Sequence, residues 1–159
     1  MPPPRKVTAP LNYSTKIDDD TTASECIRLL GKHGARAVAM LFEDGNVAGL
    51  TFKIATTRGE RSYHLPMRWQ GTHKQLQAAL AAGLLTRGGG RSSASFATEE
   101  QARRVAWRQL KDWLEAQLAL IEGGMWELAE VMLPWELVDA ETTMYQAVEA
   151  SRLELTTGR

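Results

Sequence analysis

The chain has 159 residues, of which 43% are hydrophobic and 24% charged, and its formal net charge is zero. This composition is typical of one globular domain with a buried apolar core, and it excludes a disordered or fibrous chain. Every apolar run is too short to cross a bilayer, and the single cysteine, Cys26, excludes an internal disulfide, so we expect a cytoplasmic protein without a membrane partner.

The N-terminal part predicts a tail followed by helix starts. Residues 1–12 contain four prolines and are expected to form a flexible tail, and residues 13–17 could form a short edge strand. Three threonines are each followed, three places later, by Glu or Gln, which is the capping-box pattern that begins a helix. These pairs are Thr22 with Glu25, Thr72 with Gln75, and Thr98 with Gln101. The first two predict short helices over residues 23–33 and 73–84.

Three β-type runs lie between these two helices. The runs RAVAMLF and VAGLTFKIA flank EDGN, an Asp-Gly turn typical of a hairpin, and RSYHL follows a second turn and ends at Pro66. The predicted fold class is therefore α+β. We expect an antiparallel meander of three strands, or four if residues 13–17 join it, with two short helices over residues 13–85. Segment 86–97, rich in Gly, Ser and Arg, is predicted to be a flexible linker.

Residues 98–159 are predicted to be helical. Apolar residues follow one another in steps of 3, 4, 4, 3, 4, 3 and 4 from Trp107 to Met132, and this spacing passes through Gly123 and Gly124 without a change of phase. It predicts one long helix over residues 99–133 that ends before Pro134, followed by a short final helix over residues 140–153.

The second half of this long helix is apolar on most of its sides, which predicts self-association. A helix of this kind needs a second apolar cover, and an identical helix from another chain would supply it. Alternatively, the final helix folds back as the cover. The expected oligomer interface comprises Leu118, Ile121, Gly123, Gly124, Met125, Trp126, Leu128 and Met132.

Charge is divided unevenly along the chain. From Arg58 to Lys111 there are ten basic and three acidic residues, whereas from Asp112 to Ser151 there are nine acidic residues and no Lys or Arg. Such asymmetry indicates charged partners or association between chains.

Several short motifs in the chain together resemble those of a known family. KHGA, the LP that follows the third strand, and EAQLALIEGGM leading into LPW resemble a family of small uncharacterised bacteriophage and prophage proteins over residues 13–138. The resemblance implies a phage protein in the cytoplasm of a bacterial host. It implies no activity, cofactor or site residue.

The strongest candidate site is basic. Arg104, Arg108 and Lys111 fall on one stripe of the long helix and could neutralise phosphates, with Trp107 available for stacking on a base. The alternative is a solvated helix face. The full set expected to bind nucleic acid is Arg87, Arg91, Arg103, Arg104, Arg108 and Lys111.

The other candidate motifs favour structural roles. The triplet Asp18–Asp20 precedes a helix and suits its dipole, the three histidines have no metal-ligand spacing, and RGGGR lacks the GK[ST] ending of a phosphate-binding loop. No cofactor or metal is expected.

Two functional hypotheses follow from these observations. The first is a non-enzymatic, phage-type accessory protein that self-assembles and binds DNA or RNA through the basic residues. The second is a protein-binding module, such as an inhibitor of a host protein, that uses the acidic and apolar C-terminal region. A small enzyme remains a third hypothesis, because a site assembled in space can escape a motif search.

Overall fold

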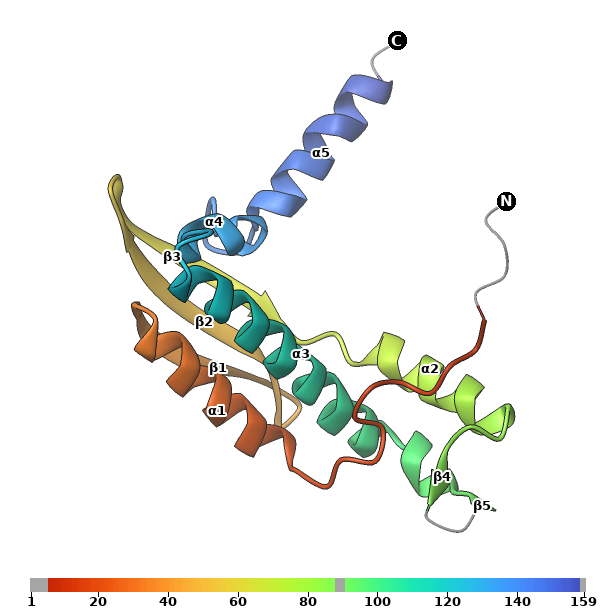
Figure 1. Cartoon of the computed structure of the whole chain (residues 1–159). Helices are drawn as coiled ribbons and strands as arrows, with labels where there is room; N and C mark the ends of the chain where they lie inside the picture. Colours follow the sequence, from red (N-terminus) through yellow and green to blue (C-terminus); the bar gives the residue numbers. More distant parts are fainter. Residues whose placement is uncertain (1–5, 88–90, 158–159) are drawn as a thin grey trace. The chain divides into compact units, whose positions relative to one another are not determined.

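A computed structural model of the chain describes residues 6–87 and 91–157 (Figure 1). The chain forms two compact units. The first unit comprises Met1–Ser24 and Met67–Trp113, and the second unit comprises Glu25–Pro66 and Leu114–Arg159. Helices α1 (Asp19–Lys32) and α3 (Glu99–Glu122) each contribute residues to both units.

The second unit contains an antiparallel sheet with the strand order β1-β2-β3, which confirms the α+β class and the three-stranded meander. Asp44 and Gly45 connect β1 and β2 with φ values of 49° and 78°, the positive values that a type I′ hairpin turn requires. The strands are β1 (Ala35–Glu43), β2 (Asn46–Thr56) and β3 (Gly59–Pro66).

The core of the second unit is built on the central strand β2, where Leu50, Phe52 and Ile54 are buried. Phe52 stacks on Tyr63, its partner on β3, with ring centroids 5.4 Å apart. Figure 1 shows the second-unit parts of α1 and α3 passing over one face of this sheet. Leu30 from α1 and Leu118 from α3 are buried there, because the apolar stripe of each helix needs an apolar surface to cover it.

The free edge of β3 is covered by a segment from the C-terminal third. Tyr63 and Glu136 form an isolated antiparallel bridge, and the Leu137 N–H donates to the Ser62 carbonyl at 2.8 Å. An exposed strand edge offers unpaired backbone groups to other chains, so this segment closes one edge of the sheet.

The first unit has its own core between α2 (Gln70–Ala81) and the N-terminal half of α3. The core consists of Leu76, Ala79, Leu85, Phe96, Ala102 and Val105. Its remaining elements are the short strands β4 (Thr86–Arg87) and β5 (Arg91–Ser92) and the 3-10 helix η1 (Ala94–Ala97).

Two sequence-based expectations in the first unit are wrong. Residues 13–17 form no strand, because the Gln101 amide donates to the carbonyls of Tyr13 and Thr15, both at 2.8 Å, and so takes the place of a strand partner. The predicted linker 86–97 contains β4, β5 and η1, and Phe96 within it is buried in the core. Residues 88–90 of this segment lie outside the described residues, as does the start of the predicted tail, residues 1–5.

The prediction of one helix over residues 99–133 is also wrong, because α3 ends at Glu122. Gly124 adopts φ 73°, its N–H donates to Ile121 at 2.9 Å, and the Met125 N–H donates to Leu120 at 3.0 Å. These two bonds form the Schellman motif that terminates many helices. The apolar spacing persists only because Leu128 is buried again after the chain has turned.

Beyond the turn, the chain forms short helices and one longer one. They are α4 (Leu128–Val131), the 3-10 helix η2 (Leu133–Trp135) and α5 (Met144–Thr157). The predicted final helix therefore exists, but it begins four residues later than expected, at 144 instead of 140. No helix among the described residues is long and apolar enough to span a membrane.

The helix end at Gly124 generates the first prediction. Replacing Gly124 with Ala puts a Cβ on a left-handed residue, so we expect a loss of about 1–2 kcal/mol in the free energy of unfolding. Gly123→Ala is the matched control, because a Cβ there meets only ordinary contacts at 3.5 Å and 3.6 Å. Urea denaturation measures both variants. Stabilisation by Gly124→Ala would mean that the helix continues, since Ala favours a helix over Gly by about 1 kcal/mol.

Candidate functional site

The predicted basic stripe of α3 is paired with acidic residues of the first unit. The Arg104 guanidinium donates to Asp18 from Nε at 3.0 Å and from Nη2 at 2.8 Å, and its Nη2 also donates to Glu100 at 2.7 Å. Two carboxylates therefore neutralise Arg104. The acidic residue Asp18, expected to act on a helix dipole, also acts as a counter-ion for α3.

The other predicted basic residues of α3 are also engaged. The Arg103 guanidinium lies 4.0 Å from an Asp19 carboxylate oxygen and 5.4 Å from the centre of the Trp69 ring. Arg108 donates to the Thr22 hydroxyl at 3.5 Å, and Lys111 is half-buried. Trp107, considered for base stacking, is fully buried and belongs to the core. A nucleic acid on this stripe would therefore have to compete with contacts inside the chain.

Arg87 and Arg91 face each other in the register of the β4–β5 hairpin. Their side chains lie outside the part of the chain that the structure describes. Their predicted contact with nucleic acid stays a prediction.

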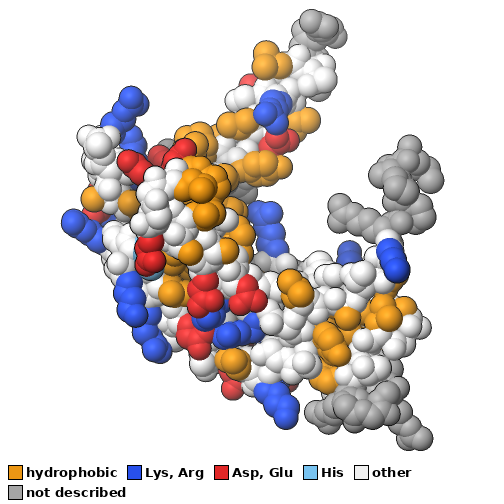
Figure 2. Space-filling model, viewed as in Figure 1, with side chains coloured by type: hydrophobic (Ala, Val, Ile, Leu, Met, Phe, Trp, Pro, Cys, Tyr) orange, Lys and Arg blue, Asp and Glu red, His pale blue; other side chains and the backbone are white. Residues whose placement is uncertain are grey.

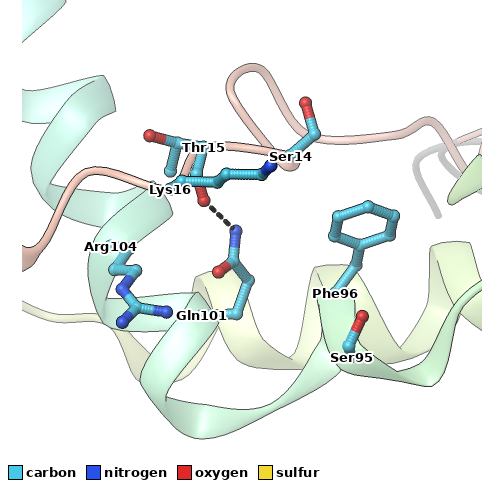
Figure 3. Close-up of a pocket in the computed structure, with 7 residues that line it drawn as sticks. All are labelled: Ser14, Thr15, Lys16, Ser95, Phe96, Gln101 and Arg104. Atoms are coloured by element: carbon cyan, nitrogen blue, oxygen red, sulfur yellow. Dashed lines mark hydrogen bonds between the residues drawn. The ribbon is translucent and has the colours of Figure 1, made fainter. Parts of the chain in front are cut away.

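A pocket of about 580 Å³ adjoins Arg104 (Figure 3). Gln101 fixes its wall, because its amide holds the carbonyls of Tyr13 and Thr15 and so orders the loop that carries Lys16. Three hydroxyls and the Lys16 ammonium could bond an anion. The charge on Arg104 is already shared by two carboxylates, which weakens any such site. The lining residues are Ser14, Thr15, Lys16, Ser95, Phe96, Gln101 and Arg104.

The residues predicted for an oligomer interface separate into two groups. Leu118, Leu128 and Met132 are buried within the chain itself, so they are not available to a second copy in this conformation. The exposed members are Gly123, Gly124, Met125 and Trp126, and Ile121 is half-buried. Met125 and Trp126 retain 61% and 40% of their accessible surface, which is unusual for side chains of this size.

These exposed side chains border a groove of about 640 Å³ in the second unit. Ile121, Met125, Trp126 and Leu128 supply its apolar surface. The other lining residues are His33, Gly124, Glu127 and Glu130. The groove exists because the turn at Gly124 carries the chain away from the axis of α3.

His33 joins the ends of α1 and α3 at this groove. Its Nδ1 lies 2.7 Å from the Leu29 carbonyl oxygen, and its Nε2 lies 2.7 Å from a Glu122 carboxylate oxygen. Both partners are acceptors, so the imidazolium form makes both bonds and the neutral ring makes only one. Sequence reasoning missed this pair, because 89 positions separate the two residues and neither belongs to a motif.

Tyr63 lies in a second titratable cluster, on the edge of β3. Its hydroxyl lies 3.5 Å from Glu136, and the Arg61 guanidinium lies 3.8 Å from the same carboxylate group. Burial, reinforced by the negative charge of Glu136, raises the pKa of Tyr63 to about 12. The cluster fastens the C-terminal segment to the sheet, and this structural role explains its burial.

Neither a metal-binding cluster nor an exposed cysteine is found among the described residues. Within residues 6–87 and 91–157, no group of three or more His, Cys, Asp or Glu residues is arranged to hold a metal ion. Cys26 is fully buried, and His73 bonds the Ala97 carbonyl at 3.0 Å.

Comparison with known proteins adds no family to this description. No protein-family model, no curated protein and no solved structure matches the chain. The resemblance to phage proteins therefore stays a prediction.

The pairing of Arg104 generates the second prediction. Asp18→Asn removes one of its two counter-ions, so we expect stronger binding of single- and double-stranded DNA at low salt than in the natural chain. Asp20→Asn is the control, because it makes the same charge change in the same triplet outside that pair. Mobility shift at two salt concentrations measures the difference. Equal binding by the two variants would show that Asp18 does not limit access to Arg104.

The pKa of Tyr63 generates the third prediction. In the unfolded chain this phenol titrates near its ordinary pKa of 10.0, whereas in the folded chain its pKa is about 12. Its contribution to stability is therefore complete below pH 10 and is lost as the pH rises from 10 towards 12. Denaturation across this range should show a steeper fall for the natural chain than for Tyr63→Phe. Parallel curves would contradict the assignment.

Proposed function

We propose that this chain is a protein-interaction module that binds a partner protein through the surface of its C-terminal third. The supporting observation is the amount of large apolar side chain exposed between residues 123 and 157. Eight such side chains retain more than a third of their surface. They are Met125, Trp126, Leu133, Val138, Tyr145, Val148, Leu153 and Leu155.

An exposed apolar surface with a charged border is typical of a protein interface. Figure 2 shows hydrophobic side chains gathered over the α4 region with acidic side chains beside them. Trp and Met are also residues that interfaces favour, since a large or adaptable side chain buries much area on contact. In this proposal the acidic residues confer selectivity, and the apolar ones supply affinity.

Self-association through the same surface is a related proposal. Met125 and Trp126 are the predicted interface residues that remain exposed, so they would carry a contact between copies. The interface would be smaller than the one expected from a continuous helix, because Leu118, Leu128 and Met132 already pack inside the chain.

Nucleic-acid binding by a phage-type accessory protein is the second candidate function. One observation favours it, namely that Lys16 and three hydroxyl side chains line the pocket beside Arg104. The ion pairs of Arg103 and Arg104 oppose it. Because of these pairs we place protein binding first.

The proposed function generates the fourth prediction. Peptides that bind the natural chain can be selected from a random library. We expect their affinity for the double variant Met125→Ser/Trp126→Ser to be about tenfold lower or weaker still, because buried Trp side chains dominate the binding energy of many interfaces. Phe42→Ser is the matched control, since Phe42 is 66% exposed on β1, outside the surface. Isothermal calorimetry measures affinity, and hydrogen exchange locates the bound peptides. Protection confined to the first unit would remove the proposal. Sedimentation of the same variants tests self-association.

A further inference from the structure

The groove beside the end of α3 has an apolar surface and an acidic border. Ile121 and Leu128 are largely covered, whereas Met125 and Trp126 stand exposed at its side. An amphipathic helix docks in such a groove by burying one apolar face. The apolar surface therefore fits a helix better than it fits an extended polar segment.

The acidic border carries charge that the described chain does not neutralise. Glu130 accepts a hydrogen bond from the Glu127 N–H at 3.3 Å, which holds both residues at the start of α4. Among the described residues, no Lys or Arg forms an ion pair with Glu127 or Glu130. The Glu122 carboxylate lies 2.7 Å from the His33 ring nitrogen Nε2. The groove therefore presents net negative charge beside an aromatic ring, and Trp is the ring that best attracts a cation.

The described helices of this chain do not have the positive charge and free apolar face that would complement the acidic border of the groove. Helix α5 has one basic residue, Arg152, which pairs with Glu149 at 3.1 Å, and it also carries Glu154. The basic residues of α3 are engaged in the first unit. Helices α1 and α2 carry exposed Arg28, Lys32 and Lys74, but their apolar side chains, such as Leu30 and Leu76, are buried within the chain. A second copy would therefore bring no helix with both a free apolar face and free basic residues, and charge complementarity favours a different protein.

We propose that this groove binds a positively charged amphipathic helix of a partner protein. The apolar face of that helix packs on Met125, Trp126 and Ile121, and its Lys or Arg side chains reach Glu127 and Glu130. The inference rests on the proposed function, which it narrows to one groove and one class of partner.

The test uses a synthetic helical peptide with Leu on one face and Lys on the other. Its matched partner carries Glu at every Lys position, so that the two peptides differ only in charge. Fluorescence anisotropy measures binding to the whole chain, and NMR shifts of the backbone amides locate it. We expect saturable binding of the basic peptide, with shifts centred on residues 121–130 and on His33, and binding that weakens as salt rises.

Paired variants separate charge from shape. Glu127→Gln/Glu130→Gln should weaken the basic peptide about threefold to fivefold, as expected for the loss of two partly exposed ion pairs. Glu43→Gln/Glu141→Gln removes the same charge away from the groove and should leave the affinity unchanged. Trp126→Ala should weaken binding at least about tenfold. If a variant unfolds, the shifts of the natural chain still decide where the peptide lies.

Three results would overturn the inference. They are no binding of the basic peptide, equal binding of the acidic peptide, or shifts that lie outside the groove. A dimer that Met125→Ser/Trp126→Ser dissolves would also overturn it, because a second copy would then occupy the groove. If library peptides bind the C-terminal surface but are not basic, the proposed function survives and this inference alone fails.

Discussion

The left-handed turn at Gly124 is the constraint on which the C-terminal third depends. A residue with φ 73° cannot continue an α-helix, so the chain leaves the axis of α3 at this point. The turn lets Leu128 and Met132 return to the core of the second unit. It also leaves Met125 and Trp126 on the outside. The backbone conformation of Gly124 thus decides which apolar side chains of this segment are buried and which are exposed.

The same turn at Gly124 also allows the C-terminal segment to cover the edge of the sheet. After η2 the chain pairs Glu136 with Tyr63 and covers the edge of β3, where the ion pair with Arg61 and the buried phenol hold it. If α3 continued without interruption to residue 133, it would be several turns longer. The segment that contains Glu136 would then begin far from the edge of β3. Closure of β3 and formation of the groove therefore have one cause.

Charge has a different role in each unit. In the first unit, Asp18 and Asp19 form ion pairs with Arg104 and Arg103 of α3, so part of the predicted binding stripe is engaged inside the chain. In the second unit, Glu127 and Glu130 at the groove have no Lys or Arg partner among the described residues, and Glu122 contacts the ring of His33. Opposite charges that meet inside a chain contribute to its fold, whereas charges left at an apolar surface select what binds there. The structure therefore directs attention from the basic block to the acidic one.

The sequence by itself determined the elements whose signals are local. The Asp44–Gly45 hairpin, the three strands and the amphipathic α1 and α2 follow from turn chemistry and from periodicities that a few neighbouring residues contain. Of the three predicted capping patterns, only the one at Thr98 begins its helix, where the Thr98 hydroxyl accepts from the Gln101 N–H at 3.1 Å. The other two are wrong, because α1 begins at Asp19 and α2 at Gln70, so Thr22 and Thr72 lie inside their helices.

Only the tertiary structure decided the contacts between distant residues. Arg104 meets Asp18 across 86 positions, and His33 meets Glu122 across 89. No local pattern encodes such pairs. The end of α3 belongs to the same class, because the spacing of apolar residues is equally compatible with a straight helix and with a turn that buries Leu128 afterwards. Periodicity reports which residues are buried, and it does not report which segment of the chain buries them.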